Sequence, residues 1–297
     1  MSQVTRLNVA FDDYPQTRAL KGGAVKSDRV ALSFSEIKPA NKFFKPMVRE
    51  LKFDISEMAI ATYLQAKACG KPLVLLPATI MGRFQHGTIL YNAARGALTP
   101  ADLPGKRVGV RSYSQTTITW VRGILANDYG VDLDRLHWVS QEDGHVAEYH
   151  EPPSVERAVP EKNLLQMLRE GEVDAAIYGA NLPSDPMLKS VIPDPERAAD
   201  DWYARHKVVP INHMVVATEK LSNSNPEAVR EVFRMLVESK RAAGLPRPGS
   251  IDVLPFGVDA CRPALRMMID YAMQQKLLPR PLVVDELFDD RTRALKP

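Results

Sequence analysis

The chain alternates short apolar runs with segments of helical period. An apolar run of four to eight residues between turn residues is typical of a buried strand, whereas apolar positions at every third and fourth residue are typical of a helix. The alternation of the two predicts an α/β protein with a mostly parallel sheet. In the first ninety residues the expected elements are strands at 6–11, 29–34, 53–55 and 72–79, and helices at 43–51 and 56–70.

A second α/β set follows from about residue 98. Pro100 and Pro104 punctuate its entry, and Gly130 is expected to end its first helix. The polar stretch that follows contains several prolines and is expected to be a loop. The expected elements are strands at 106–110 and 136–140, a helix in the second half of 112–130, the loop at 141–162, a helix–turn–strand unit at 163–179 and a returning segment at 206–218.

The last third of the chain is helical in pattern. Asn225 and Pro226 form an N-cap and N1 pair, which predicts the start of a helix. Apolar residues recur at helical spacing in two stripes, and each stripe predicts an amphipathic helix packed on a core. The stripes are Val229, Val232, Phe233, Leu236 and Val237, and then Ala264, Leu265, Met268, Ile269 and Ala272.

The order of these elements predicts two units, the first of them discontinuous. Residues 1–92 and 210–297 are expected to form the first unit, and residues 93–209 the second. The chain would cross between them at 87–94 and 209–218, which are expected to be the strands of a hinge.

Composition narrows the class of protein. The chain has 297 residues, 45% of them hydrophobic and 25% charged, with a net charge of +3 and no basic run, so nucleic acid is not an expected partner. Cys69 and Cys261 are far apart in the sequence and lie in no metal-ligand motif. No stretch approaches the roughly 20 apolar residues of a membrane span, and the first apolar run is too short for a signal peptide. The expectation is a cytoplasmic protein with no membrane partner.

Several segments resemble a known fold and a known enzyme family. The segments 102–110 and 163–177 resemble the second lobe of type II periplasmic-binding proteins, which implies a two-lobed α/β fold with two crossing hinge strands and a central ligand cleft. A narrower resemblance, to the 4,5-dihydroxyphthalate decarboxylase family, covers almost the whole chain. Its five ordered blocks are FDISEMAIATYL (53–64), RFQHGTILYN (83–92), GKRVGVRSYSQTTITWVRGIL (105–125), PINHMVV (210–216) and PFGVDACRPALRMMIDYAMQQKLLPR (255–280).

The resemblance implies a cytoplasmic carboxy-lyase that needs no cofactor. Its substrate would be a hydroxylated aromatic acid similar to 4,5-dihydroxyphthalate, and its products CO2 and a compound similar to protocatechuate. Two segments depart from the family pattern. Arg111 and Ser112 stand where the family usually has proline and glutamate, and 179–186 lacks the usual arginine–proline pair. Both lie near the expected cleft, which leaves the ring substituents open.

Arg83, His86 and His213 are the main candidates for chemistry. An arginine fork matches a carboxylate, and an imidazole exchanges protons near neutral pH. An arginine paired with a neighbouring acid, a satisfied surface histidine at 86 and a hydrogen-bonded core histidine at 213 would explain the same residues, but the family resemblance favours a site. Arg83 is expected to hold a carboxylate. His86 is assigned as proton donor to the ring and His213 as the group that binds or deprotonates a ring hydroxyl, and these two roles are exchangeable.

Two predicted strand-to-helix turns carry further polar candidates. A helix start offers free N–H groups to an anion, although ordinary capping uses the same residue types. Ligands of open α/β sheets also gather at the carboxyl ends of strands. In the first unit, Ser56 is expected to cap a helix or bind ligand, Glu57 to orient a histidine or deprotonate a phenol, and Asp13 and Tyr14 to be secondary contacts. In the second unit the candidates are Tyr113, Ser114, Thr116, Thr117 and Arg122, and for Arg122 simple solvation of the helix is the favoured alternative.

Other functions remain open from the sequence. His86, His213 and Glu57 have the composition of a metal triad, but no close-spaced ligand motif supports one, so no metal is expected. A non-catalytic solute-binding protein of the ABC-transporter type, which captures a small aromatic carboxylate, is the main alternative. Another enzyme on the same scaffold, of the menaquinone-pathway or thiamine-pyrimidine type, is disfavoured by the block at 83–92. A homodimer is the expected assembly for a cytoplasmic enzyme.

Overall fold

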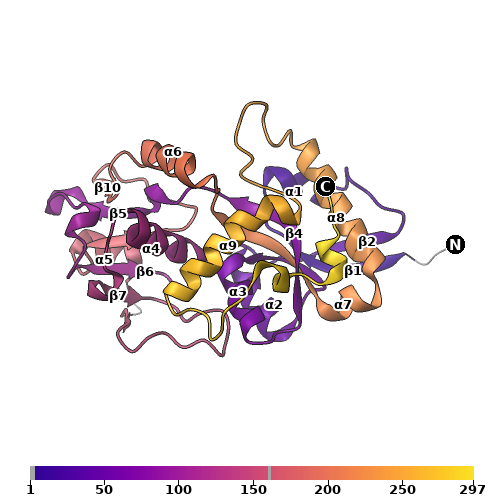
Figure 1. Ribbon diagram of the computed structural model, residues 1–297, viewed down its shortest axis with the longest axis horizontal. Coiled ribbons are helices and arrows are strands. Elements are labelled where there is room, and N and C mark those ends of the chain that lie inside the picture. Colours follow the sequence, from indigo (N-terminus) through magenta and orange to yellow (C-terminus); the bar gives the residue numbers. More distant parts are fainter. Residues whose placement is uncertain (1–3, 160–161) are drawn as a thin grey trace. The chain divides into compact units, whose positions relative to one another are not determined.

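The computed structural model describes residues 4–159 and 162–297, which divide into two units (Figure 1). The first unit takes in the chain up to Arg83, together with Ile211–Ile269 and Leu278–Pro297. The second unit takes in Phe84–Pro210 and Asp270–Leu277. Each unit has its own sheet, and each is made of segments that are separate in the sequence.

The first unit is built on a five-stranded sheet in the order β2-β1-β3-β11-β4. β1 pairs in parallel with β2 and β3, whereas β11 runs antiparallel to both β3 and β4. The late strand β11 therefore lies between two strands from the first third of the chain. The bounds are β1 (Thr5–Ala10), β2 (Val30–Phe34), β3 (Ile55–Ala59), β4 (Leu73–Gly82) and β11 (Ile211–Thr218).

Helices bury their apolar stripes against this sheet. Asn225 caps the helix α8 by accepting from the Ala228 N–H, as the sequence predicts, and the whole α8 stripe belongs to the core. α1 packs on α8, where the Leu20 N–H donates to Ser239 Oγ at 3.0 Å. The helices are α1 (Pro15–Lys21), α2 (Asn41–Glu50), α3 (Ile60–Ala68), α7 (Glu219–Ser224), α8 (Pro226–Ala242), α9 (Val258–Gln274) and α10 (Asp290–Arg293), and the last residues of α9 belong to the second unit.

The second unit has a six-stranded sheet in the order β10-β5-β9-β6-β7-β8. β6 pairs in parallel with β7 and β9, and β5 is antiparallel to its neighbours β9 and β10. The strands are β5 (Ile89–Asn92), β6 (Arg107–Val110), β7 (His137–Ser140), β8 (Glu156–Arg157), β9 (Ala175–Ile177) and β10 (Leu188–Ser190), and the helices are α4 (Thr116–Asp128), α5 (Leu164–Glu170) and α6 (Pro195–His206). Short 3-10 turns, including η1 (His86–Thr88), join them.

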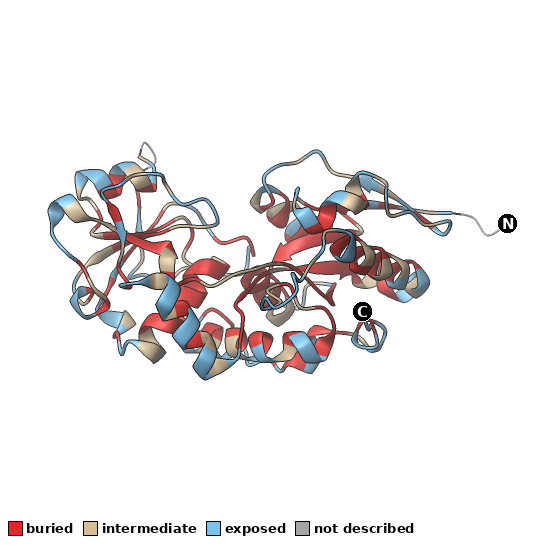
Figure 2. Ribbon diagram, turned by 90° about the horizontal axis from the view of Figure 1, so that it is seen from above, coloured by how far each residue is buried: buried red, intermediate tan, exposed pale blue. Residues whose placement is uncertain are grey.

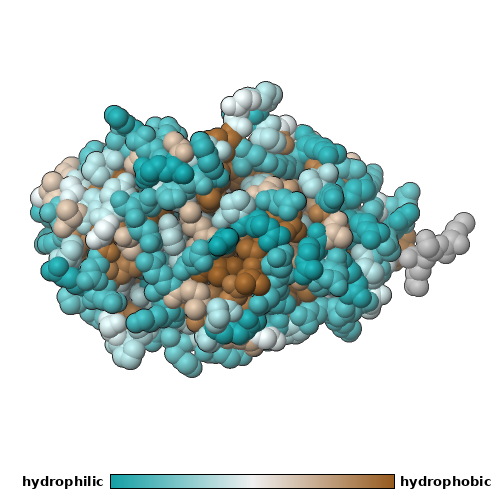
Figure 3. Space-filling view, viewed as in Figure 1, coloured by the Kyte–Doolittle hydropathy of each residue, from teal (hydrophilic) through white to brown (hydrophobic). Residues whose placement is uncertain are grey.

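Burial follows the elements in both units. The strands β3, β4, β6, β7, β9 and β11 are buried along most of their length, whereas β2 and β8 are largely exposed or half-buried. The helix α8 is buried on one side and exposed on the other, whereas α4 is buried all round over its first ten residues (Figure 2). One face of the molecule is largely hydrophilic with separate hydrophobic areas (Figure 3). Within the described ranges, no helix is long and apolar enough to cross a membrane.

Three expectations need correction. Residues 84–92 and 270–277 were expected in the first unit. β5 is hydrogen-bonded to β9 and β10 and therefore belongs to the second unit, which also takes in 270–277 at the end of α9. Residues 56–59 were expected to begin a helix, but they continue β3 because β1 and β11 both pair with this segment. The helix α6 was not predicted, since its sequence is rich in charged residues and shows only a narrow apolar face.

Candidate active site

Glu57 and His213 form the central pair of the first unit. Glu57 lies in β3 opposite Val215, and His213 lies two residues before Val215 in β11. Residues two apart on a strand point to the same face, so these two side chains are diagonal neighbours on one face of the sheet. His213 Nδ1 lies 2.6 Å from Glu57 Oε1. The register of two adjacent strands thus makes the contact between residues 156 positions apart.

The partner strand β4 is irregular beside His213. The register between β11 and β4 shifts repeatedly between Ile211 and Val215: the extra residue lies in β11 before His213, and β4 carries extra residues after it. Bulges of this kind bend a strand and re-aim its side chains, and they are frequent next to active sites. The irregular register therefore lies beside His213 itself.

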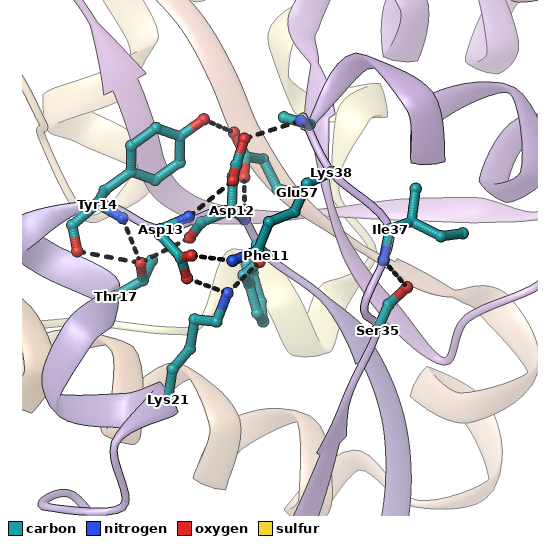
Figure 4. A network of polar contacts seen from close by, with 11 residues as sticks. Phe11, Asp12, Asp13, Tyr14, Thr17, Lys21, Ser35, Ile37, Lys38 and Glu57 are labelled. Carbon is teal, nitrogen blue, oxygen red and sulfur yellow. Dashed lines mark hydrogen bonds and ion pairs between the residues drawn. The ribbon is translucent and has the colours of Figure 1, made fainter.

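The Glu57 carboxylate accepts from two further donors (Figure 4). The Tyr14 hydroxyl donates to Oε1 at 2.8 Å, and the Asp12 N–H donates to Oε2 at 3.1 Å. Glu57 is 0% exposed, whereas the His213 side chain keeps 17% exposure. A buried carboxylate requires such donors. Because Glu57 acts as an acceptor toward Tyr14 and Asp12, the hydrogen shared with His213 is assigned to Nδ1, and Nε2 takes no part in the contact with Glu57.

Tyr14 is held as a protonated donor. Burial, followed by the nearby charge of Glu57, raises the pKa of Tyr14 well above its usual range, while the Arg83 charge opposes this rise. Its backbone N–H donates to Thr17 Oγ1 at 2.9 Å, which anchors the residue at the start of α1. The phenol therefore stays a hydrogen-bond donor to Glu57 across the working pH range.

Asp12 connects this network to α2. Its carboxylate accepts from the Ala40 N–H at 2.8 Å, just before α2 begins. From α2, the Phe44 ring meets the His213 ring edge to face, with centroids 5.1 Å apart. Asp12, which contacts Glu57, is thus hydrogen-bonded to the start of α2, and Phe44, which contacts His213, belongs to the same helix.

The two remaining first-unit candidates, Asp13 and Ser56, have protein partners of their own, and Ser56 lacks the expected capping role. Asp13 is 55% exposed at its side chain and is ion-paired with Lys21 and Lys38, which together hold the pKa of Asp13 at about 2 (Figure 4). Ser56 does not cap a helix, because the N-cap of α3 is Ala59. Instead Ser56 is buried in β3 and its Oγ donates to the Glu57 carbonyl at 2.7 Å.

Arg83 and His86 fall in different units although they are three residues apart. Arg83 follows β4 in the first unit, where burial lowers its pKa and Tyr14 raises it. His86 begins η1 in the second unit, is 1% exposed, and lies 5.9 Å from the Trp202 ring. Burial lowers the pKa of His86 to about 4, and neither of its ring nitrogens has a hydrogen-bond partner in the described parts of the chain. His86 is therefore a neutral imidazole near pH 7.

The second-unit candidates gather around the start of α4. The helix begins at Thr116, close to the predicted position, and Ser114, Thr116 and Thr117 are buried there. Arg122 was expected to solvate the helix, but it is completely buried. Its guanidinium lies over the Tyr113 ring, 3.8 Å from the centroid, and Nη2 donates to the Tyr113 carbonyl at 2.8 Å.

Metal binding has no visible basis among residues 4–159 and 162–297. No three His, Cys, Asp or Glu side chains gather there in a way that could hold an ion. Of the proposed triad, Glu57 and His213 are in contact in the first unit, whereas His86 belongs to the second.

Comparison with known proteins decides the family. No family model matches the chain. The chain is 31% identical over 286 residues to 4,5-dihydroxyphthalate decarboxylase of Comamonas testosteroni, an alignment that covers 89% of this chain and 84% of that protein. The protein of the same name from Pseudomonas putida is 33% identical over 210 residues, which cover 66% of this chain and 81% of that protein. The chain belongs to the 4,5-dihydroxyphthalate decarboxylase family. The resemblance inferred from the five sequence blocks is thereby confirmed, together with the enzyme class, a carboxy-lyase.

Solved structures confirm the fold. The periplasmic aliphatic sulphonate binding protein SsuA from Escherichia coli matches with a TM-score of 0.62 at 12% identity, over 96% of this chain and 98% of that chain. The alkanesulfonate-binding protein SsuA from Xanthomonas axonopodis pv. citri, bound to MOPS, matches with a TM-score of 0.58 at 15% identity, over 97% and 99%. This member of the decarboxylase family therefore has a periplasmic-binding-protein-like fold.

Sequence reasoning missed part of the network in this decarboxylase family member. Asp12 and Phe44 were not among the candidates, and Tyr14 was only a secondary one. Asp12 and Tyr14 do follow the first predicted strand directly, at the sheet edge where ligands gather, and that position was the available signal. No sequence signal distinguished Phe44, because an aromatic residue in a helical stripe is most often part of the core.

Proposed function

We propose that the chain removes CO2 from a hydroxylated aromatic acid of the phthalate type, with His213 and Glu57 as its proton-transfer pair. The names of the two relatives support the substrate class. The observation that carries the assignment of residues is the fully buried Glu57 held at 2.6 Å from an imidazole that keeps solvent access. A carboxylate in this position fixes the tautomer of the ring and stabilises an imidazolium during proton transfer.

The chemistry uses the electron density of the substrate. A ring hydroxyl ortho or para to the leaving carboxylate pushes an electron pair onto the carbon that bears it, and that carbon takes the proton from His213 Nε2. The bond to the carboxylate then breaks, its electron pair restores the aromatic ring, and CO2 leaves. The net change is the replacement of one carboxylate by one hydrogen. A positioned acid of this kind typically contributes about 10²–10⁴ in rate.

Arg83 is the proposed carboxylate ligand of the first unit. It is half-buried, and its charge acts on Tyr14, the direct neighbour of Glu57. A guanidinium forms a bidentate contact with a carboxylate and is little affected by partial burial, because it stays charged. A substrate carboxylate bound by Arg83 would be held near the Glu57–Tyr14 network.

We assign the role of proton donor to His213 in place of His86. A buried imidazole whose pKa lies at about 4 carries no excess proton near neutral pH, so it is poorly suited to protonate carbon. His213 has the carboxylate partner that such a role requires. The two roles were interchangeable on the sequence alone, and the environment of each ring favours this order.

The experiment is direct. Purified protein is incubated with 4,5-dihydroxyphthalate and with mono- and dihydroxybenzoates, and CO2 release is measured for the wild type, His213→Ala and the control Glu219→Gln, which changes an exposed carboxylate of the same unit. We expect release from at least one compound, full activity in the control and loss of activity in His213→Ala. Full activity in His213→Ala contradicts the assignment. Tight binding without CO2 release contradicts decarboxylation and supports solute capture, the function of the SsuA proteins that share this fold.

A further inference from the structure

Arg122 is a buried cation with unused hydrogen-bond donors. It lies in α4 of the second unit and is 0% exposed. The flat faces of Tyr113 and Trp138 lie near its guanidinium, with ring centroids 3.8 Å and 5.4 Å from Cζ. Nη2 donates to the Tyr113 carbonyl, but Nε and Nη1 have no hydrogen-bond partner in the part of the chain that the structure describes.

The acidic side chain that acts on Arg122, Glu151, is engaged elsewhere. Glu151 influences Arg122 electrostatically, but its Oε1 accepts from the Tyr113 N–H at 3.2 Å and from Ser140 Oγ at 2.9 Å. Its Oε2 accepts from Arg157 Nη2 at 3.1 Å. Burying a cation without a paired anion is costly, so such a residue is poorly explained by stability alone.

Arg107 shows what a structural arginine looks like in the same unit. Nη1 and Nη2 of Arg107 each contact a Glu156 oxygen at 2.8 Å, and Nε donates to the Glu172 carbonyl, also at 2.8 Å. Its donors are thus used on partners within the unit. Arg122 is more deeply buried than Arg107 and yet makes a single such hydrogen bond.

A second unused donor lies close to Arg122. The Tyr149 hydroxyl is buried and has no hydrogen-bond partner among the described residues. Burial raises the pKa of Tyr149 and the Arg122 charge opposes this rise, so the phenol is a neutral donor within electrostatic reach of the guanidinium. Tyr149 lies in the loop at 141–155, and Gly144 of the same loop is packed on Ser114 and Tyr149, since a Cβ on Gly144 would lie 2.9 Å from Ser114 Oγ and 3.0 Å from Tyr149 Cδ1. The backbone of Gly144 is therefore in close contact with the side chains of Ser114 and Tyr149.

We propose that Arg122 and Tyr149 bind the carboxylate of an aromatic acid within the second unit. The two oxygens of a carboxylate accept from several donors at once, and contacts with a guanidinium are among the strongest of these. The Tyr113 and Trp138 rings, which lie against the guanidinium, give the site an aromatic surrounding against which an aryl group can pack edge to face. The ligand class rests on the proposed function, but binding here requires no ring hydroxyl and no loss of CO2.

The test measures binding of phthalate, which has no ring hydroxyl to drive decarboxylation, by isothermal titration calorimetry. The variants are Arg122→Met, which keeps the aliphatic stem, Arg122→Lys, which keeps the charge, and Tyr149→Phe; Arg107→Met is the matched control. We expect the Kd to rise about 10- to 100-fold in Arg122→Met, less in Arg122→Lys, and about 2- to 10-fold in Tyr149→Phe, with no change in Arg107→Met. Unchanged affinity in Arg122→Met and Tyr149→Phe, or no binding of phthalate by the wild type, overturns the proposal.

A stability measurement separates this site from a merely structural arginine. Without ligand, we expect Arg122→Met to unfold at the same temperature as the wild type or at a higher one, because it removes an unpaired buried charge. A lower unfolding temperature together with unchanged phthalate binding by Tyr149→Phe would assign Arg122 to the core and overturn the proposal. The two proposals also fail separately. Phthalate binding that depends on Arg122 without any CO2 release removes only the proposed activity, whereas CO2 release with Arg122-independent phthalate binding removes only this site.

Discussion

The two units treat their buried polar groups in opposite ways. In the first unit, the Glu57 carboxylate accepts from the Tyr14 hydroxyl, the Asp12 N–H and the His213 ring. In the second unit, both ring nitrogens of His86 and two guanidinium nitrogens of Arg122 have no hydrogen-bond partner within the described ranges. A satisfied network fixes the orientation of its members, as proton transfer requires, whereas unused donors favour ligand binding at a cost in stability. The difference predicts that substitutions in the first unit lower turnover, and that some substitutions in the second unit raise stability.

The largest effect is expected from Glu57→Gln. The amide keeps the shape of the side chain but removes the charge that stabilises an imidazolium on His213, so kcat should fall by about 10³-fold. Steady-state CO2 release measures it, with Glu219→Gln as the matched control. A kcat within threefold of the wild type would show that Glu57 only supports the fold.

His86→Phe tests the second unit through pH. The folded-state pKa of His86, about 4, lies below the ordinary value of 6.5, so the unfolded state binds more protons between these two pH values. The wild type should therefore lose about 2 kcal/mol of unfolding free energy from this group between pH 7.5 and pH 5. The variant should lack this loss, as urea unfolding at both pH values would show.

The same variant decides the role of His86 in catalysis. An exposed histidine of the second unit, His137, provides the control substitution His137→Phe. If His86→Phe is fully folded and yet releases no CO2, His86 and not His213 is the proton donor, and the order of roles argued from their environments is wrong.

Features that depend on neighbouring residues were predicted from the sequence, whereas features that depend on contacts between distant segments were not. The strands at 6–11 and 29–34 and the start of α8 at Asn225–Pro226 were predicted correctly, because periodicity and capping are local signals. Ser56 and Glu57 were placed at a helix start, since a serine followed by a glutamate is typical of one. Strand pairing with β1 and β11, segments distant in the sequence, decides otherwise.

The candidate site shows the same limit. Glu57 and His213 were both predicted as site residues, but their contact depends on the register of β3 and β11, which a single sequence does not reveal. Arg122 was expected to be solvated because it lies on a helix beside a polar loop. Its burial depends on how that loop and the ring of Tyr113 pack, which composition alone does not predict.

Tyr14→Phe is expected to have an intermediate effect. It removes one of the donors to the buried Glu57 carboxylate and keeps the ring, so kcat should fall about 3- to 10-fold. Because the pKa of Tyr14 is raised, the phenol does not titrate in the working range, and the pH–rate profile should keep its shape between pH 6 and 9. Tyr129→Phe, at an exposed tyrosine, is the control. A profile that changes shape would mean that Tyr14 itself transfers the proton.

The smallest effect is expected from Asp13→Asn. Its carboxylate is 55% exposed and bridges Lys21 and Lys38 at the surface, where ion pairs contribute less than about 1 kcal/mol. Activity should stay within twofold of the wild type, and thermal unfolding should change little. A large loss of activity would place Asp13 in contact with substrate and extend the site beyond the Glu57 network.

The position of β11 between β3 and β4 has a consequence during synthesis. On the ribosome, β3 and β4 emerge long before the strand that joins them, and Phe84–Pro210, the larger part of the second unit, is translated in the interval. Until then each of these two strands offers an unpaired backbone edge, which is a template for association with other chains. A nascent chain that stalls before Ile211 therefore lacks both the imidazole and the middle of its first sheet, and such a truncated product is expected to depend on chaperones or to aggregate.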